Sequence, residues 1–326
     1  MIQDIPIREL KVGMYVILPG SWFSHSFLKN EFLITSEDQI TKIVDSQLRH
    51  VKVDLSRSKM PEERDQGTTP SEPGEKPPPS GQIIPHELGS LLRDRALPPQ
   101  QKAQAVKQHS AIMMKNLLDN PTAGNIREAK KGISEIVDMI IADDETAQYM
   151  LSITSHDYYT YTHSVNVGVL AVSLSKALFE KSRAHDLREL GAGFFLHDLG
   201  KVRVDINIIN KPGKLTEEEM NQMKKHPNAG YKILHETGQL TEECGKIVLQ
   251  HHERYDGTGY PQGLRGKEIH IYGRICSMAD VFDALTTERP YRNKLDPFQA
   301  LMVMKKEMLH HFQQDLFEQF VMLFKQ

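Results

Sequence analysis

The stretch LRELGAGFFLHDLGK, residues 187–201, sets titratable side chains into an otherwise apolar helical pattern. Leu190, Phe194 and His197 are spaced i, i+4 and i+7, so an α-helix places them on one face, toward the core. A lone histidine there is more often a hydrogen-bonded core residue. Asp198 changes this interpretation, because a carboxylate beside a core-facing imidazole is costly unless a cation neutralises it. The pattern therefore predicts a buried helix that ends in a cation site.

The chain has 326 residues and a formal net charge of −3. This charge is close to neutral for a chain long enough to form one large domain and one small domain. No overall basic field would attract nucleic acid or an anionic membrane, so we expect neither DNA nor a membrane as a partner. An anionic substrate would have to be held by locally placed cations.

Cys244 and Cys276 are the only cysteines, and they lie far apart in the sequence. We expect both to be buried as small hydrophobic residues without a disulfide, which fits a reducing cytosol. The sequence begins without the apolar run of a signal peptide, and it contains no stretch of about 18 uncharged apolar residues. These features predict a cytoplasmic protein.

Residues 1–55 are predicted to form a small α/β domain. Alternating apolar residues in MYVIL (14–18), EFLIT (31–35) and HVKVD (50–54) predict short strands. A helix is predicted between the second and the third of them, where Ser36 and Gln39 have the spacing of a capping box.

Residues 56–85 contain seven prolines and three glycines and almost no apolar residues, which predicts a flexible linker. From residue 86 to 326 helical periodicity continues with few strand signals, and Thr216 and Asp296 are placed as helix N-caps. We therefore expect a mainly all-α protein, in which the helical domain follows the small α/β domain and the linker.

Five histidines lie on or at the end of predicted helices, where one buried site could use them: His163, His197, His226, His251 and His252. His163 shares a helical face with Val167 and Leu170, so it also points inward. His226 is expected to end a helix immediately before Pro227, because the residue before a proline is restricted in its backbone conformation.

Other candidates leave alternatives open. His251 and His252 diverge by about 100° on a helix, so they could contact two ions, or one of them could lie outside the ligand set. Asp280 lies in an apolar helix, where a capping or hydrogen-bonded carboxylate is the alternative to a metal ligand. His310 and His311 are expected in the last turn of a Lys-rich helix, as partners of its carboxyl end.

Five imidazoles and two carboxylates, with no thiolate, favour iron, manganese or cobalt over structural zinc, magnesium or calcium. Seven ligands exceed the needs of one ion. Two ions about 3.5–4 Å apart, bridged by Asp198 and a hydroxide, would use them all and would activate water for an in-line phosphoryl displacement. The set therefore predicts hydrolysis of a phosphate ester.

The segments HDLGK (197–201) and HHERYDGTGYPQGL (251–264) together resemble the HD-GYP domains, a branch of the HD metal-dependent phosphohydrolases associated with hydrolysis of cyclic di-GMP. Three more segments agree in order and spacing: SHDYYTYTHSVNVG (155–168), KKHPNAGYKIL (224–234) and ADVFDALTTERPYR (279–292). The resemblance covers about residues 125–325. The N-terminal module is similar to a small domain often found ahead of HD-GYP domains.

The resemblance implies roles for individual residues. The metal ligands would be His163, His197, Asp198, His226, His251, His252 and Asp280. Lys201 would contact the scissile phosphate. Gly259 and Tyr260 would line the pocket, although a turn with a packed aromatic ring is the alternative. Arg289 and Arg292 would hold phosphates or guanine edges. Members with three metals carry an acidic residue where this chain has Tyr159, so two metals are expected.

The expected activity is that of a cyclic di-GMP phosphodiesterase with two divalent ions, iron or manganese, that yields pGpG and in a further step GMP. One alternative is a cyclic di-GMP sensor that docks proteins such as diguanylate cyclases, and another is a hydrolase of a different cyclic dinucleotide. Seven complete ligand positions favour the enzyme. The sequence leaves homodimer formation open.

Overall fold

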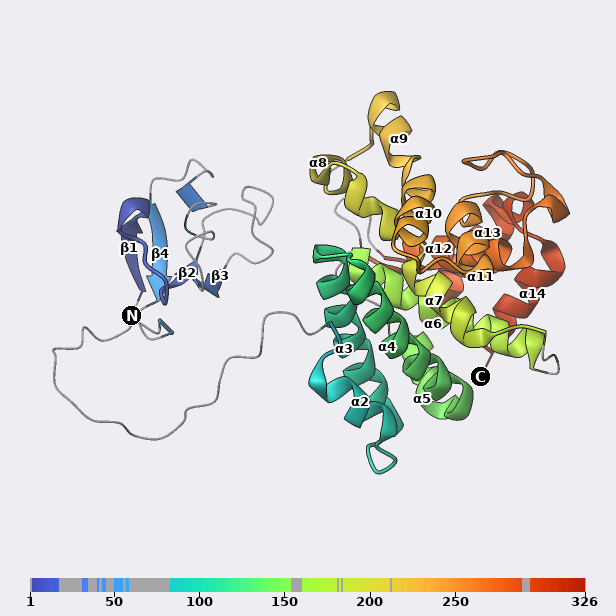
Figure 1. Ribbon diagram of the computed structural model, residues 1–326, viewed down its shortest axis with the longest axis horizontal. Coiled ribbons are helices and arrows are strands. Elements are labelled where there is room, and N and C mark those ends of the chain that lie inside the picture. Colours follow the sequence, from blue (N-terminus) through green and yellow to red (C-terminus); the bar gives the residue numbers. More distant parts are fainter. Residues whose placement is uncertain are drawn as a thin grey trace. The chain divides into compact units, whose positions relative to one another are not determined.

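The computed structural model describes residues 2–17, 31–34, 40, 43–44, 50–54, 57–58, 83–153, 160–180, 182, 184–211, 213–288 and 294–325. The chain forms two compact units, Met1–Lys76 and Pro77–Gln326, and each has its own apolar core (Figure 1). Ile83 already belongs to the core of the second unit.

The N-terminal unit contains a four-stranded antiparallel sheet in the order β1-β4-β2-β3. The strands are β1 (Ile2–Pro6), β2 (Tyr15–Ile17), β3 (Glu31–Leu33) and β4 (His50–Asp54), and a 3-10 helix, η1 (Ile7–Glu9), follows β1. Alternation puts Val51 and Val53 of β4 into the core beside Val16. The structure confirms the three strands that the sequence predicts. The Ser36–Gln39 capping box lies outside the described residues.

Strand β1 was not predicted. It is a short edge strand that pairs with β4, from Ile2 opposite Asp54 to Pro6 opposite His50. Proline is tolerated at such an edge because its missing N–H breaks no central hydrogen bond.

The second unit is helical, and its described residues contain no β-strand. Its α-helices are α2 (His86–Arg93), α3 (Pro99–Asp119), α4 (Ala123–Ala142), α5 (Asp144–Ser152), α6 (Thr160–Phe179), α7 (Leu187–Leu196), α8 (Ile206–Ile209), α9 (Glu217–Met223), α10 (His226–Glu236), α11 (Glu242–Gln250), α12 (Ile271–Thr286), α13 (Pro297–Glu307) and α14 (Gln314–Met322). Its 3-10 helices are η3 (Leu199–Arg203), η4 (Gly266–Glu268) and η5 (Leu309–His311). The mainly all-α fold class is confirmed.

Side-chain caps begin several of these helices. Thr216 and Glu219 form the predicted capping box of α9, and Asp296 caps α13 with Pro297 in its first turn. Asp186 caps α7 by accepting hydrogen bonds from the N–H groups of the next turn. This cap fixes where α7 starts, and so where its last residues deliver the following His-Asp pair.

Helix α6 lies at the centre of the second unit, as Figure 1 shows, and it packs against α3, α4, α7 and α12. Its residues from His163 to Ser175 are all buried, which explains why it has no polar face.

Cys244 and Cys276 are free and buried, as expected.

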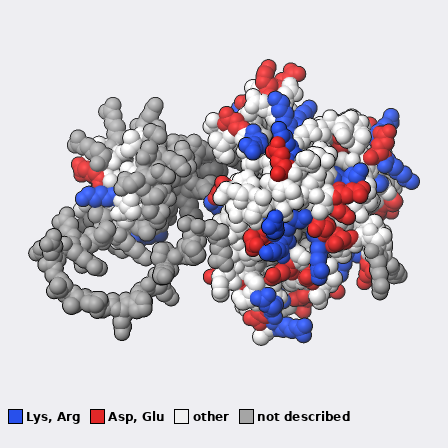
Figure 2. All heavy atoms as spheres, viewed as in Figure 1, with Lys and Arg blue, Asp and Glu red and all other residues white. Residues whose placement is uncertain are grey.

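Side chains of both charge signs lie on the surface of the helical unit (Figure 2). On the face shown in Figure 2, lysine and arginine side chains of the helical unit are interspersed with aspartate and glutamate. Among the helices that the structure describes, none is both long and apolar enough to cross a bilayer.

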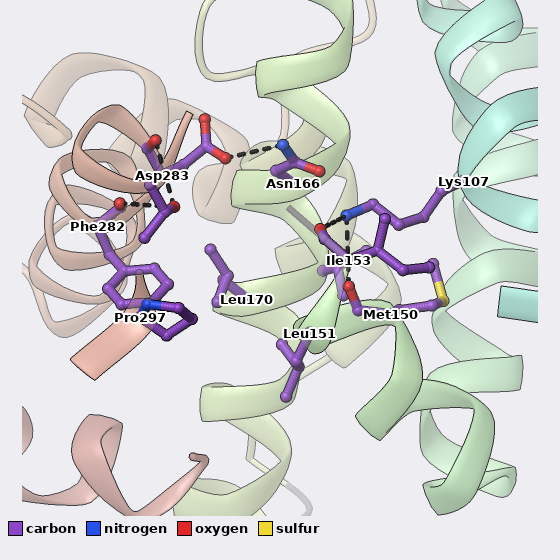
Figure 3. A pocket seen from close by; sticks show the side chains of 11 residues that line it. Lys107, Met150, Leu151, Ile153, Asn166, Leu170, Phe282, Asp283 and Pro297 are labelled. Carbon is purple, nitrogen blue, oxygen red and sulfur yellow. Dashed lines mark hydrogen bonds between the residues drawn. The ribbon is translucent and has the colours of Figure 1, made fainter. Parts of the chain in front are cut away.

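A small pocket lies between α3, α5, α6 and α12, and Lys107 reaches into it (Figure 3). The Lys107 ammonium donates hydrogen bonds to the carbonyl of Ile153 at 2.8 Å and to that of Met150 at 3.3 Å. Burial lowers the pKa of Lys107 to about 8, although the charge of Asp283 opposes this shift. Lys107 therefore links α3 to the carboxyl end of α5 through these two hydrogen bonds.

Candidate metal centre

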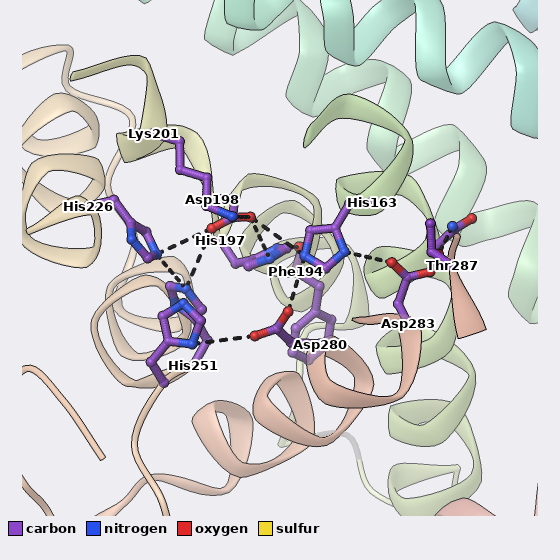
Figure 4. Close-up of polar contacts among 12 residues, drawn as sticks. His163, Phe194, His197, Asp198, Lys201, His226, His251, Asp280, Asp283 and Thr287 are labelled. Atoms are coloured by element: carbon purple, nitrogen blue, oxygen red, sulfur yellow. Dashed lines mark hydrogen bonds and ion pairs between the residues drawn. The ribbon is translucent and has the colours of Figure 1, made fainter. Parts of the chain in front are cut away.

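The seven predicted ligands converge from five segments of the helical unit (Figure 4). His163 lies in the first turn of α6, and His197 and Asp198 follow the last residue of α7. His251 and His252 follow α11 in the same way. The remaining two ligands are His226 of α10 and Asp280 of α12.

The prediction that His226 ends a helix is wrong. Helix α9 ends at Met223, and His226 is the first residue of α10, with Pro227 in its first turn. A proline is tolerated there because the first N–H groups of a helix have no partner within the helix. His226, the residue before Pro227, is itself the first residue of α10, so the pre-proline preference does not end the helix at this point.

One group of ligand atoms surrounds Oδ2 of Asp198. The Nε2 atoms of His163 and His197 lie 3.6 and 3.5 Å from it. His163 Nε2 is also 3.1 Å from Oδ1 of Asp280. The donor atoms of His163, His197 and Asp280 all lie within 4.8 Å of one another, so they could hold one ion.

A second group surrounds the other oxygen of the same carboxylate. Oδ1 of Asp198 lies 3.3 Å from His226 Nε2 and 3.8 Å from His251 Nε2. His252 completes this group, and its Nδ1 is 3.4 Å from Oδ2 of Asp280. Asp198 therefore presents one oxygen to each group, which is the geometry of a bridging ligand.

Backbone carbonyls orient three of the imidazoles. His197 Nδ1 lies 2.7 Å from the carbonyl of Phe194, and the Nδ1 atoms of His226 and His251 lie 2.8 Å from carbonyls three residues earlier. Since a carbonyl can only accept, each Nδ1 carries the proton and each Nε2 presents its lone pair to the centre. Such contacts are typical of metal-binding histidines.

Burial and charge keep these ligands in their metal-binding forms. Burial opposes ionisation of Asp198, but Lys201 and His197 outweigh it and hold the pKa of this carboxyl well below its ordinary value. Burial lowers the pKa of His226 to about 4 and that of His252 to about 3. Burial also lowers the pKa of His251. Near pH 7 the carboxylate is therefore charged and these three imidazoles are neutral.

This arrangement leaves electron-rich atoms facing one another. The Nε2 atoms of His226 and His251 are 3.0 Å apart, although both carry lone pairs in these tautomers. His197 Nε2 and Asp198 Oδ1 are buried and have no hydrogen-bond partner among the described residues. Buried lone pairs at such distances are costly unless a cation lies between them. The residues therefore fit divalent metal ions.

Asp283 was missed by the sequence analysis. It lies one helical turn after Asp280 on α12, is buried, and places Oδ2 2.6 Å from His163 Nδ1. A carboxylate at this position holds the ring of His163 with Nε2 toward the centre. The sequence offered one signal, a second aspartate within the apolar helix ADVFDAL.

The loop after α11 brings Tyr260 beside the ligands. Its ring stacks on His252 with a centroid distance of 4.6 Å. Glu253 is buried and accepts hydrogen bonds from the N–H groups of Gln262 and Leu264, which fixes the loop. At Gly259 a Cβ would lie 2.4–2.6 Å from backbone atoms of residues 252–254, so the close approach there is to the chain itself. Sequence reasoning missed Glu253, whose only signal is its place directly after the histidine pair.

Of the remaining residues that the sequence analysis considered for this site, only Lys201 lies in the described part of the chain. The Nζ atom of Lys201 lies 2.5 Å from Asp198 Oδ2, so this lysine stands at the edge of the centre. Arg289 and Arg292 lie outside the described residues, and so does Tyr159.

The helical fold and its His/Asp cluster define a metal-binding phosphohydrolase domain. A family model described as "HD domain" matches residues 135–316, and one described as "Domain of unknown function (DUF3391)" matches residues 2–140. The chain therefore belongs to the HD domain family, among its HD-GYP phosphodiesterases.

Individual proteins support this assignment. Cyclic di-GMP phosphodiesterase PA4108 of Pseudomonas aeruginosa is 32% identical over 98% of this chain and 76% of that protein. 3'3'-cGAMP-specific phosphodiesterase 3 of Vibrio cholerae is 37% identical over 46% of this chain and 32% of that protein. The structure of Bd1817, an HDG"Y"P protein from Bdellovibrio bacteriovorus, covers 98% of both chains with a TM-score of 0.62 and 16% identity, which supports the fold.

Proposed function

We propose that this protein hydrolyses a 3′–5′ phosphodiester bond of cyclic di-GMP with two divalent metal ions, iron or manganese. The observation that carries the proposal is the position of Asp198, whose two oxygens face two separate groups of ligands. Two ions held by these two groups would suit in-line displacement at phosphorus. The substrate is proposed from the name of PA4108, which is similar to this chain over nearly its whole length.

When bound, the two ions would supply Lewis-acid stabilisation and a water molecule that ionises near neutral pH. The protein's own residues have distinct roles. Asp198 would join the two halves of the centre, and Asp280, whose oxygens face His163 and His252, would span it from α12. His226, His251 and His252, which are neutral near pH 7, would hold their positions without adding positive charge.

Lys201 and Tyr260 would act on the substrate. The Lys201 ammonium stands at the rim of the centre, with 13% of its side chain exposed, where it can offset charge that develops on the phosphate. Burial raises the pKa of Tyr260, so its hydroxyl stays protonated and can donate a hydrogen bond. The first product would be linear pGpG, and release of GMP would require a second hydrolysis.

The test is anaerobic purification with iron or manganese, followed by metal analysis and chromatography of the products from cyclic di-GMP. We expect two ions per chain and formation of pGpG. Asp198→Ala should lose both the metal and the activity, whereas His235→Ala, on the exposed side of α10, should keep both. An active, metal-replete Asp198→Ala protein would contradict the proposal.

The same assay separates the alternatives. Tight binding of cyclic di-GMP without turnover would favour a sensor that acts through partner proteins such as diguanylate cyclases. Faster turnover of 3'3'-cGAMP than of cyclic di-GMP would assign the other cyclic dinucleotide, which the name of the Vibrio cholerae relative makes a relevant comparison.

A further inference from the structure

A second group of metal-binding side chains lies outside the centre described above: Asp256, His310 and His311. Asp256 belongs to the loop after α11, and the two histidines belong to η5 near the C-terminus. The prediction that these histidines lie in the last turn of a helix is wrong, because α13 ends at Glu307 and they lie beyond it. This position turns them toward the loop instead.

The three side chains face one another at distances that no hydrogen bond explains. Nε2 of His310 lies 3.8 Å from Asp256 Oδ2, and Nε2 of His311 lies 4.0 Å from the same oxygen. Hydrogen bonds between nitrogen and oxygen are about 2.7–3.2 Å long. His311 Nδ1 is also buried without a hydrogen-bond partner among the described residues, so the structure does not satisfy this ring as an imidazolium.

The orientation of Asp256 is fixed independently of the histidines. Its Oδ1 accepts hydrogen bonds from the N–H of Thr258 at 2.9 Å and from the Thr258 hydroxyl at 2.8 Å. Oδ2 is the oxygen that faces both imidazoles. The carboxylate is therefore held with one oxygen available to a ligand.

The two backbone segments are also held together. The N–H of Tyr255 donates to the carbonyl of His311 at 2.9 Å, directly beside the three side chains. Gly266 N–H donates to the Tyr255 carbonyl at 2.9 Å, which closes the loop behind them. An ion entering here would meet a largely formed site rather than having to order two mobile segments.

We propose that Asp256, His310 and His311 form a separate zinc site that joins the loop after α11 to η5. Two imidazole nitrogens and one carboxylate oxygen form a three-ligand set that zinc accepts, with water in the fourth position. Two zinc bonds of about 2.0–2.2 Å at a tetrahedral angle span about 3.4 Å, so each imidazole nitrogen needs to approach Asp256 Oδ2 by about half an ångström. His310, whose side chain is 60% exposed, is free to make that adjustment.

The ligand types, and not the nearby charge of Arg254, indicate which metal fits. Nη1 of Arg254 lies 3.4 Å from the Thr258 hydroxyl, so a positive charge stands near the site. This charge opposes the binding of any divalent ion, so the ligand types must decide between the metals, and calcium and magnesium prefer shells of oxygen ligands. Zinc bonds more strongly to imidazole nitrogen, which supplies two of the three ligands here.

A zinc ion bound by Asp256, His310 and His311 would restrain the loop after α11. This loop also carries Tyr260, four residues after Asp256. Through Tyr260, whose ring stacks on that of His252, the loop contacts the main centre. Zinc at the peripheral site would therefore stabilise the loop without contacting the substrate.

The test uses the full chain, stripped of metal and titrated with zinc against a chromophoric chelator to count the bound ions. The double variant H310A/H311A should bind one zinc fewer per chain than the wild type, and H235A should bind the same number as the wild type. Manganese-dependent hydrolysis by the double variant should persist, which separates this result from any failure of the main centre.

If the double variant does not fold, H310A alone tests the same site, because its side chain is mostly exposed. H310A should weaken the binding of one zinc ion at least 10-fold and reduce the rise in melting temperature that zinc causes. Equal zinc counts and equal affinities in H310A and the wild type would overturn the proposal.

Discussion

Asp283 decides how well His163 can serve as a ligand. Its Oδ2 contacts His163 Nδ1, while its Oδ1 accepts hydrogen bonds from Asn166 at 2.8 Å and from Thr287 at 3.1 Å. Asp283→Asn keeps the shape but removes the charge that raises the basicity of the imidazole. We expect metal affinity to fall at least 10-fold, as is typical when such a partner is changed. Competitive metal titration measures this, together with activity at saturating metal.

Thr287→Val is the matched control for this substitution. It removes one hydrogen bond from the same carboxylate but leaves the contact between Asp283 and His163. Its effect on metal affinity should be clearly smaller than that of Asp283→Asn. Equal losses in the two variants would mean that the buried network acts only through packing.

At the scale of elements, the approach of η3 to α10 depends on Gly200. A Cβ on Gly200 would lie 1.9 Å from the carbonyl oxygen of His226 and 2.4 Å from the backbone nitrogen of Gly230. Backbone atoms cannot move aside cheaply, so Gly200→Ala should push α10 away and carry His226 with it. We expect a loss of about 2–3 kcal/mol in unfolding free energy, or roughly 5–10 °C in melting temperature.

Gly124→Ala provides the control within the same unit. Gly124 lies in α4, and a Cβ there would meet nothing within 4 Å. Alanine in a helix is favoured over glycine, so this variant should be unchanged or stabilised by up to about 1 kcal/mol. Calorimetry of both variants, with metal analysis, checks the pair; a Gly200→Ala protein as stable and metal-rich as the wild type would refute the close-approach argument.

Lys107 gives the link between α3 and α5 a pH dependence. Its pKa is about 8 in the folded protein, against an ordinary value of 10.5 for a lysine in the unfolded chain. Between these values the unfolded chain binds more protons, so the contribution of Lys107 to stability rises with pH. From pH 8 to pH 10 the wild type should gain about 2 kcal/mol relative to Lys107→Met.

Denaturant unfolding of both proteins across this pH range measures the difference. Lys232→Met, in which an exposed lysine is replaced, controls for the general effect of pH. Parallel stability curves for the wild type and Lys107→Met would show that Lys107 does not titrate in this window.

At the scale of the whole molecule, the sequence predicts those features of the fold and the site that depend on a local residue pattern. Helical periodicity and an aspartate beside a core-facing histidine are local features, so the fold class and the approach of Asp198 to the other six ligands could be anticipated. Asp283 could not be assigned a role, because its partner His163 lies 120 residues away and only the packing of α12 on α6 brings them together. The start of α10 at His226 and the edge strand β1 likewise depend on neighbours that are distant in sequence.

The limits of the helical unit differ between the structure and the family models. The compact unit begins at Pro77, whereas the DUF3391 model extends to residue 140 and so includes α2, α3 and most of α4. Helix α4 packs on α7, the helix that leads into His197, and a Cβ on Gly191 of α7 would lie 2.3 Å from Val137. These helices therefore belong structurally to the metal-binding unit.

Truncation tests this boundary. Residues 77–326 should unfold cooperatively and keep their metal, because their core is separate from that of the sheet. Residues 141–326 should fail to do so. Removing α4 takes away five fully buried large aliphatic side chains, Ile126, Ile133, Ile136, Val137 and Ile140. At about 1.5–3 kcal/mol each, this loss is comparable to the entire stability of a typical domain, about 5–15 kcal/mol. Circular dichroism melting and metal analysis of both fragments decide between the boundaries, and a stable, metal-replete 141–326 fragment would place the limit at the end of the DUF3391 match instead.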